Sequence, residues 1–142
     1  MKSSSIQAIE TKFAPKPVGP YNQAVLVENY LYCSGQIALD PSTGVMIGAG
    51  NIEEETRQVL KNLMAVVEAA GGKSSNVIRT TIYLTDLNDF AKVNEIYAET
   101  FNETVSPARA CVEVSNLPKG GKIEIDCIAW LEKKRSEKQH YD

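Results

Sequence analysis

The chain has 142 residues, 43% of them hydrophobic and 23% charged, and its formal net charge is −3. This length favours one domain, spanning residues 1–142, that buries its own core, and we expect only residues 1–5 and 133–142 to be flexible. The ordinary composition argues against a disordered or membrane protein, since no apolar run approaches the roughly 20 residues that cross a bilayer. No apolar secretory signal opens the sequence, so we expect a cytoplasmic protein.

The acidic balance provides no broad basic field, so tight binding to nucleic acid through charge is not favoured. Three widely spaced cysteines (Cys33, Cys111 and Cys127) are typical of free thiols in a reducing compartment. The single histidine, His140, lies in a polar tail, so neither a histidine metal site nor a Ser-His or Cys-His nucleophile pair is supported. We expect no metal and no cofactor, which leaves carboxylate, arginine, tyrosine and backbone chemistry.

The first third of the chain predicts strands and turns. Residues 13–23 hold three prolines and a glycine, which indicates a surface loop between extended segments. Residues 24–39 are rich in β-formers around a turn at Glu28 and Asn29, and Asp40 to Gly44 forms a strong turn signal. Two or three strands are therefore expected here.

Two helices are expected after these strands. Asn51 is a good N-cap, with Glu54 three residues on as in a capping box, and Gly71 with Gly72 ends the helix. The residues between recur at three- and four-residue steps as one apolar face: Ile52, Thr56, Val59, Leu60, Leu63, Val66, Val67 and Ala70. Residues 76–87 predict a strand, and residues 88–101 predict a second helix with Phe90, Tyr97 and Phe101 on one face.

Residues 106–130 read as two more strands joined by a turn near Pro118 and Lys119. The whole order, three strands, helix, strand, helix and two strands, predicts an α+β fold: a mixed sheet with both helices on one face. Strand alternation in this expected hairpin places five polar side chains together on the face away from the helices: Arg109, Cys111, Glu113, Glu124 and Asp126. The hairpin register then brings Glu113 near Glu124 and Cys111 near Asp126.

Two interpretations of this polar face stay open. Charged strand residues are usually solvated on an open antiparallel sheet. Cys111, Ile128 and Trp130 share the face, however, which is more typical of a subunit interface with a polar site at its edge. Asn94, four residues after Phe90, is expected to be a hydrogen-bonded structural residue.

Four segments, in this order, resemble the Rid family of reactive-intermediate deaminases, also called YjgF: VGPYNQAV (18–25), CSGQIALDPSTG (33–44), TTIYLTDLNDFAKVNEIYAETF (80–101) and PARACVEVSNLPKGGKIEIDCIA (107–129). The resemblance covers nearly the whole chain up to about Leu131, and the ordered combination is more specific than any short motif. It implies a chorismate-mutase-like fold and a homotrimer with sheets facing inward and sites between subunits.

The resemblance also implies a reaction, the hydrolysis of 2-imino acids released by pyridoxal-phosphate dehydratases (2-iminobutanoate and 2-iminopropanoate) to 2-oxo acids and ammonia. Arg109 falls on the family's substrate-carboxylate arginine and Glu124 on its water-binding glutamate. Further positions that line the family's site are occupied by Tyr21, Ser34, Asn94 and Cys111. This assignment suits the chemistry, because arginine offers two parallel donors to a carboxylate and a glutamate can hold a water and shuttle protons.

Several alternatives remain beside the resemblance. Tyr21 is able to donate to the substrate, with anchoring of its loop as the alternative. Cys111 is expected to matter for backbone and packing because no base partner is identifiable. Glu113 and Asp126 have no assigned role. The partners expected are a small 2-imino or 2-oxo acid and further copies of the chain, not a membrane; RNA is not favoured. Two other functions stay open, an endoribonuclease that inhibits translation and a non-catalytic ligand-binding or holdase-like trimer.

Overall fold

The computed structural model describes residues 6–102 and 105–132. The expected flexible segments 1–5 and 133–142, together with His140, lie outside the described residues. The described elements follow the predicted order: β1 (Ile6–Ile9), β2 (Ala24–Val27), β3 (Tyr30–Gln36), α1 (Ile52–Ala69), β4 (Val77–Leu84), α2 (Phe90–Thr100), β5 (Ala108–Glu113) and β6 (Ile123–Trp130). Short 3-10 turns precede three of them: Ser74–Asn76, Leu87–Asp89 and Pro118–Gly120.

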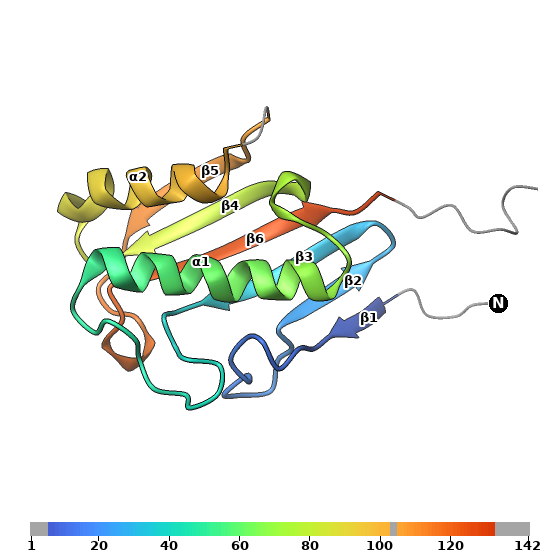
Figure 1. Cartoon of the computed structure of the whole chain (residues 1–142), viewed down its shortest axis with the longest axis horizontal. Helices are drawn as coiled ribbons and strands as arrows, with labels where there is room; N and C mark the ends of the chain where they lie inside the picture. The colour runs from blue at the N-terminus through green and yellow to red at the C-terminus, as the bar shows by residue number, and fades with distance from the viewer. Residues whose placement is uncertain (1–5, 103–104, 133–142) are drawn as a thin grey trace, which may run out of the picture.

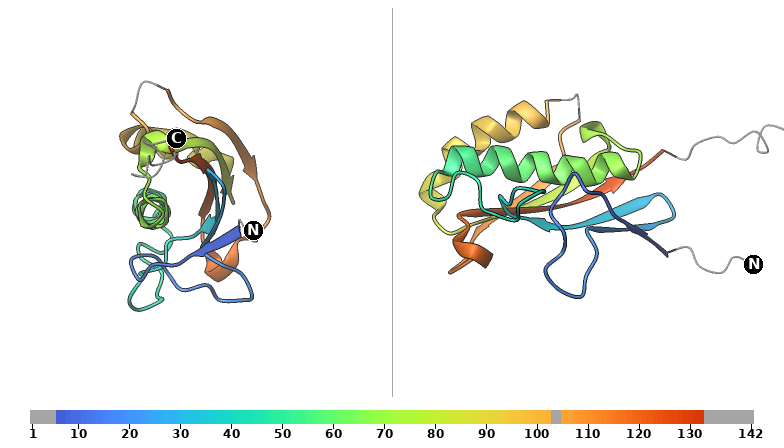
Figure 2. Two further views of the ribbon diagram at one scale, coloured as in Figure 1. Left: turned by 90° about the vertical axis from the view of Figure 1, so that its right-hand side faces the viewer. Right: turned by 60° about the horizontal axis from the view of Figure 1, so that its bottom comes forward.

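The strands form one six-stranded mixed sheet in the order β1-β2-β3-β6-β4-β5 (Figure 1). β4 and β5 are parallel, and every other neighbouring pair is antiparallel. Both helices cover the same face of the curved sheet, and α1 lies within its curve (Figure 2). The α+β prediction, a mixed sheet with two helices on one face, is confirmed. The opposite face, called the open face below, carries no helix within the described residues.

The predicted hairpin at residues 106–130 is wrong. β6 lies between β3 and β4, and β5 lies at the sheet edge beside β4, so β4 separates the two strands. After β4 the chain passes over the helix-covered face of the sheet as α2 and returns as β5, which runs parallel to β4. Two neighbouring parallel strands need a crossover connection of this kind. The expected contacts of Glu113 with Glu124 and of Cys111 with Asp126 therefore do not form.

The predicted single polar face is wrong for the same reason. Arg109 and Cys111 are paired with Thr80 and Ile82, which are fully buried beneath the helices. Because paired residues share a face, Arg109, Cys111 and Glu113 lie on the helix-covered side. Glu124 and Asp126 alternate with buried Ile123 and Ile125 and so lie on the open face. The arginine and the glutamate that the sequence grouped together thus occupy opposite sides of the sheet.

Helix α1 begins at its predicted N-cap and ends as predicted. The Asn51 side chain accepts a 3.0 Å hydrogen bond from the Glu54 N–H, and Gly71 follows the helix with φ of 94°, a conformation that favours glycine. The other half of the predicted capping box does not form, because the Asn51 N–H donates to Gly48 O at 2.7 Å and not to the Glu54 side chain. The predicted apolar face is buried except for Ala70, which is half-buried.

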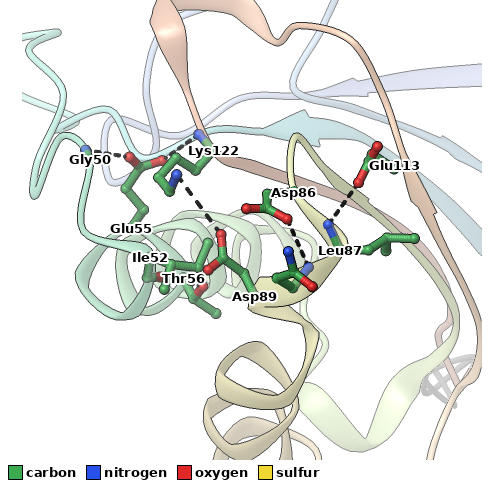
Figure 3. Close-up of polar contacts among 10 residues, drawn as sticks. Gly50, Ile52, Glu55, Thr56, Asp86, Leu87, Asp89, Glu113 and Lys122 are labelled. Atoms are coloured by element: carbon green, nitrogen blue, oxygen red, sulfur yellow. Dashed lines mark hydrogen bonds and ion pairs between the residues drawn. The ribbon is translucent and has the colours of Figure 1, made fainter.

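Three polar residues on the buried side of α1 were not predicted: Glu55, Gln58 and Asn62. The Glu55 carboxylate accepts 2.9 Å hydrogen bonds from the Gly50 and Lys122 N–H groups (Figure 3). Asn62 Nδ2 donates to Ile37 O and Leu39 O at 3.1 and 2.9 Å. Buried polar groups are costly without such partners. These two side chains therefore fix the loop after β3 and the start of β6, the two segments that flank Glu124.

The core lies between the helices and the covered face of the sheet. Its fully buried members include Leu31, Leu63, Ile82 and Ile125. All three cysteines are free, as predicted, with Cys33 and Cys127 buried opposite each other on β3 and β6. Neither helix among the described residues is long and apolar enough to cross a membrane.

Candidate functional site

Arg109 lies on a platform built by helix α2. Its Nη1 donates a 2.7 Å hydrogen bond to Asn94 Oδ1. The guanidinium carbon lies 4.9 Å from the ring centroid of Tyr97 and 5.4 Å from that of Phe90. A cation over aromatic faces is attracted by their quadrupoles, and the amide fixes its rotation. The guanidinium is therefore held in one place and orientation.

The platform follows from the spacing of α2. Phe90, Asn94 and Tyr97 recur at helical steps and face β5, where the crossover from β4 delivers Arg109. Tyr97 is fixed from below by a 2.6 Å hydrogen bond between its hydroxyl and Thr80 Oγ1. Asn94 was expected to be a hydrogen-bonded structural residue. It is hydrogen-bonded in the structure, and its partner is Arg109, the arginine of the candidate site.

Cys111 lies two residues beyond Arg109 on the same face of β5. Its side chain is half-buried against the core. Burial raises the pKa of the Cys111 thiol, and the nearby Arg109 charge only partly opposes this. A thiol with a raised pKa stays protonated at neutral pH and is a poor nucleophile. The structure agrees with a packing role for this side chain.

Glu124 lies on the open face beside Gly35 of β3. A β-carbon built on Gly35 would lie 2.8 Å from Glu124 Cδ and closer still to its Oε2. Gly35 falls where the pairing of β3 with β6 shifts between Cys33 and Gln36, and glycine in a strand often marks such a bulge or a close approach. The missing side chain of Gly35 leaves the space that the Glu124 carboxylate fills.

Burial raises the pKa of Glu124, and the negative charge of Asp126 raises it further. The ionised form loses solvation in the half-buried position and is repelled by a second carboxylate. A carboxyl whose pKa moves toward neutrality exchanges protons more readily at physiological pH. Glu124 is thus suited to take a proton from water and to return it.

Tyr21 and Ser34 lie close to Gly35. Tyr21 and Gly35 both line a small pocket of about 100 Å³. The Tyr21 hydroxyl accepts a 3.4 Å hydrogen bond from the Val18 N–H, which supports the loop-anchoring interpretation. Ser34 Oγ donates to Asn22 O at 2.6 Å and so ties the strand to the same loop.

Gln23, which sequence reasoning missed, holds this loop from the inside. Its buried side chain accepts a 2.7 Å hydrogen bond from the Thr11 N–H and donates to three carbonyls, those of Thr11, Ala14 and Pro15. A glutamine beside a proline-rich loop carries little signal in the sequence, because its role depends on the fold of segments 12 residues away.

The six predicted site residues fall into two groups. Arg109, Asn94 and Cys111 form the first group, on the helix-covered side at the β5 edge, and Glu124, Tyr21 and Ser34 form the second, around Gly35. Glu124 of β6 is paired with Tyr83 of β4, and Tyr83 is paired with Val112 of β5, which lies three residues beyond Arg109. Arg109 is therefore two strands across the sheet from Glu124 and three residues along β5. These two steps place the Cα atoms of Arg109 and Glu124 about 14 Å apart. One chain does not bring both groups to one small molecule.

A larger pocket, of about 720 Å³, lies against α1 and is lined by residues such as Phe13, Gln58 and Met64. None of the six predicted residues lines it. Within 6–102 and 105–132, no group of three or more His, Cys, Asp or Glu side chains is arranged to hold a metal ion.

The Endoribonuclease L-PSP family model matches residues 11–131. A RutC family protein of Synechocystis is 52% identical over 127 residues, covering 89% of this chain and 98% of the relative. The human 2-iminobutanoate/2-iminopropanoate deaminase is 47% identical over 129 residues, covering 91% and 93%. The crystal structure of E. coli TdcF with bound serine has a TM-score of 0.84 and 41% identity, covering 89% of this chain and 99% of that one.

The family match spans every element from β2 to β6, and the solved structure has the same arrangement of helices and sheet. The resemblance drawn from the four sequence segments is confirmed: the chain belongs to the Endoribonuclease L-PSP family, also called the YjgF or Rid family.

Proposed function

We propose that this protein hydrolyses small 2-imino acids, such as 2-iminobutanoate and 2-iminopropanoate, to 2-oxo acids and ammonia. The observation that carries the proposal is the fixed guanidinium of Arg109. Within the described ranges its hydrogen bond goes to Asn94 alone, so further N–H donors are available for a substrate carboxylate. The human relative named as a 2-iminobutanoate/2-iminopropanoate deaminase supports the same substrate class.

Glu124 supplies the proton transfers in this proposal. The imine reacts with its nitrogen protonated. As a water oxygen bonds to the imine carbon, the Glu124 carboxylate accepts a proton from that water, and the electron pair of the C=N double bond becomes the lone pair of a neutral amine. Protonated Glu124 then gives its proton to the amine nitrogen. The C–N bond breaks, ammonia leaves, and the hydroxyl proton passes back to the Glu124 carboxylate as the carbonyl of the 2-oxo acid forms; Glu124 then releases this proton to solvent. The raised pKa of Glu124 suits both directions of transfer.

The proposed site needs two copies of the chain, because Arg109 and Glu124 lie on opposite sides of one sheet. We propose a homotrimer, with the open faces turned inward, in which Arg109 of one copy and Glu124 of another border the same cleft. The open face supports this assembly with large exposed apolar side chains, among them Tyr30, Tyr32, Val112 and Trp130. The polar groups Glu124 and Asp126 lie beside them.

The direct test couples the protein to a threonine dehydratase and follows the imine by semicarbazide trapping. The expected result is less trapped imine and faster formation of the 2-oxo acid, with the effect lost in Arg109→Ala. Arg57→Ala is the matched control, since Arg57 is an exposed arginine of α1 paired with Glu99. Undiminished trapping with the wild-type protein contradicts the proposal, and a monomer by sedimentation contradicts the shared site.

The endoribonuclease alternative takes its support from the family's name. Its test is RNA cleavage by a nuclease-free preparation: activity that disappears in Glu124→Gln favours it. Ligand binding without imine hydrolysis favours the non-catalytic alternative instead.

A further inference from the structure

Asp126 and Tyr83 lie beside Glu124 on the open face of the sheet. Asp126 is two residues beyond Glu124 on β6, and Tyr83 is the residue of β4 directly paired with Glu124. The Tyr83 hydroxyl donates a 3.0 Å hydrogen bond to Asp126 Oδ2. One tyrosine thus spans from the partner position of Glu124 to the next carboxylate along the strand.

This arrangement fixes a second carboxylate close to Glu124. Residues i and i+2 of a strand point to the same face about 7 Å apart, and directly paired side chains across a ladder lie closer still. An unrestrained aspartate would turn away from a neighbouring carboxylate, because like charges repel. The hydrogen bond from Tyr83 instead holds the Asp126 carboxylate on the same face of the sheet as Glu124.

Tyr83 is suited to remain the donor. Burial raises the pKa of the Tyr83 hydroxyl, and its hydrogen bond to Asp126 and the charges of Asp126 and Glu124 raise it further. The hydroxyl therefore keeps its proton at neutral pH and donates it to Asp126, which as a carboxylate only accepts. The negative charge of the pair therefore resides on Asp126, and this charge raises the pKa of Glu124.

The other charged or titratable groups near Glu124 lie on β3, on the segments around the small pocket, and directly before β6. From β3, Gly35 presents no side chain, and beyond it Lys16, Tyr21 and Lys119 line the small pocket. Directly before β6, the Nζ of Lys122 lies 3.9 Å from Asp89 Oδ2, next to the start of α2 (Figure 3). Asp126 is the charged group that acts on the Glu124 carboxyl.

We infer that Tyr83 and Asp126 are positioning residues for Glu124: Tyr83 fixes the Asp126 carboxylate beside Glu124, and that charge favours the proton-bearing form of Glu124 that releases ammonia. The inference rests on the proposed imine hydrolysis, and it names the Asp126 carboxylate as one reason why Glu124 holds a proton in that reaction. It also assigns a role to Asp126, which the sequence motifs left without one.

The test is a carbon-13 NMR titration of the Glu124 side-chain carboxyl, assigned by comparison with Glu124→Gln. In Asp126→Asn the amide oxygen still accepts from Tyr83 but carries no charge, so the midpoint of the Glu124 titration should move to lower pH. Asp126→Glu should largely keep the wild-type midpoint, and Tyr83→Phe should give a smaller shift in the same direction as Asp126→Asn. Glu113→Gln is the matched control, because Glu113 is an exposed strand carboxylate on the other side of the sheet. In this variant the midpoint of the Glu124 titration should stay at the wild-type value.

An unchanged Glu124 midpoint in Asp126→Asn overturns the inference, and so does an equal shift in Glu113→Gln. The titration needs no substrate, so it is read independently of imine hydrolysis; a wild-type protein without hydrolysis contradicts the proposed function alone. Where hydrolysis is present, the pH profile of its rate in Asp126→Asn should move with the titration of Glu124. A uniform loss of rate at every pH would indicate a merely structural role and contradict the inference.

Discussion

The Glu124 carboxylate occupies the space that a side chain on Gly35 would need. Any β-carbon at position 35 would overlap Glu124 Oε2 and come within 2.8 Å of Cδ. Gly35 has no positive φ, so its role here is close approach and not a left-handed turn. The bulge in β3 and the carboxylate of β6 therefore depend on each other.

Gly35→Ala should displace the Glu124 side chain and lower imine hydrolysis by at least tenfold. Overpacking of this kind costs about 1–3 kcal/mol, so the fold should survive with a lower melting temperature. Circular dichroism and the coupled trapping assay measure the two effects separately. Gly121→Ala is the control, because its nearest contact would be an ordinary 3.4 Å to Pro118 O, and it should keep the wild-type rate. A Gly35→Ala variant with full activity would show that Glu124 is not needed where it lies.

The sequence predicted local structure better than it predicted neighbours. Caps and periodicity located α1 and α2, because those signals act within a few residues. The partner of a strand depends on the whole topology, so β5 and β6 were wrongly paired and Arg109 and Glu124 were wrongly placed on one face. Glu55, Gln23 and Asn62 were missed for a similar reason: their hydrogen-bond partners lie on segments far along the chain.

Asn94→Ala should weaken substrate binding more than it slows the chemical step. A hydrogen bond to a charged group contributes about 1.5–3 kcal/mol, equivalent to roughly a 10- to 100-fold rise in KM. In the proposed mechanism Arg109 holds the unreactive end of the substrate in the ground state and in the transition state alike. Asn94→Asp should be worse, because its carboxylate would pair with Arg109 and compete with the substrate carboxylate. Asn102→Ala, at an exposed amide that donates to Glu99 O, is the control and should change nothing. Equal activity of both Asn94 variants with wild type would remove Asn94 from the site.

Cys111→Ala should retain imine hydrolysis within a fewfold of wild type. Burial raises the pKa of the Cys111 thiol, so the thiol is protonated at neutral pH and the described structure gives it no base. Iodoacetamide should therefore modify Cys111 slowly at pH 7 and faster as the pH rises, as followed by mass spectrometry. An inactive Cys111→Ala protein of normal stability would require a covalent role for the thiol and refute the proposed mechanism.

Glu124→Gln should make the folded protein more stable at neutral pH while abolishing proton transfer. The pKa of Glu124 is raised in the folded state above its ordinary value of 4.5 by burial and by Asp126. The folded state therefore binds the proton of Glu124 more tightly than the unfolded state does. The contribution of Glu124 to the free energy of unfolding is fully present below about pH 4.5 and is lost as the pH rises through the pKa of the folded state. Glutamine cannot ionise, so the free energy of unfolding of the variant should exceed that of wild type increasingly across that window and then level off. Urea unfolding at a series of pH values and one protein concentration measures this difference, with Glu113→Gln as a control expected to gain nothing. A difference that shrinks as the pH rises would mean that Glu124 is stabilised as an anion, and a carboxyl stabilised in that form would be a poor donor to departing ammonia.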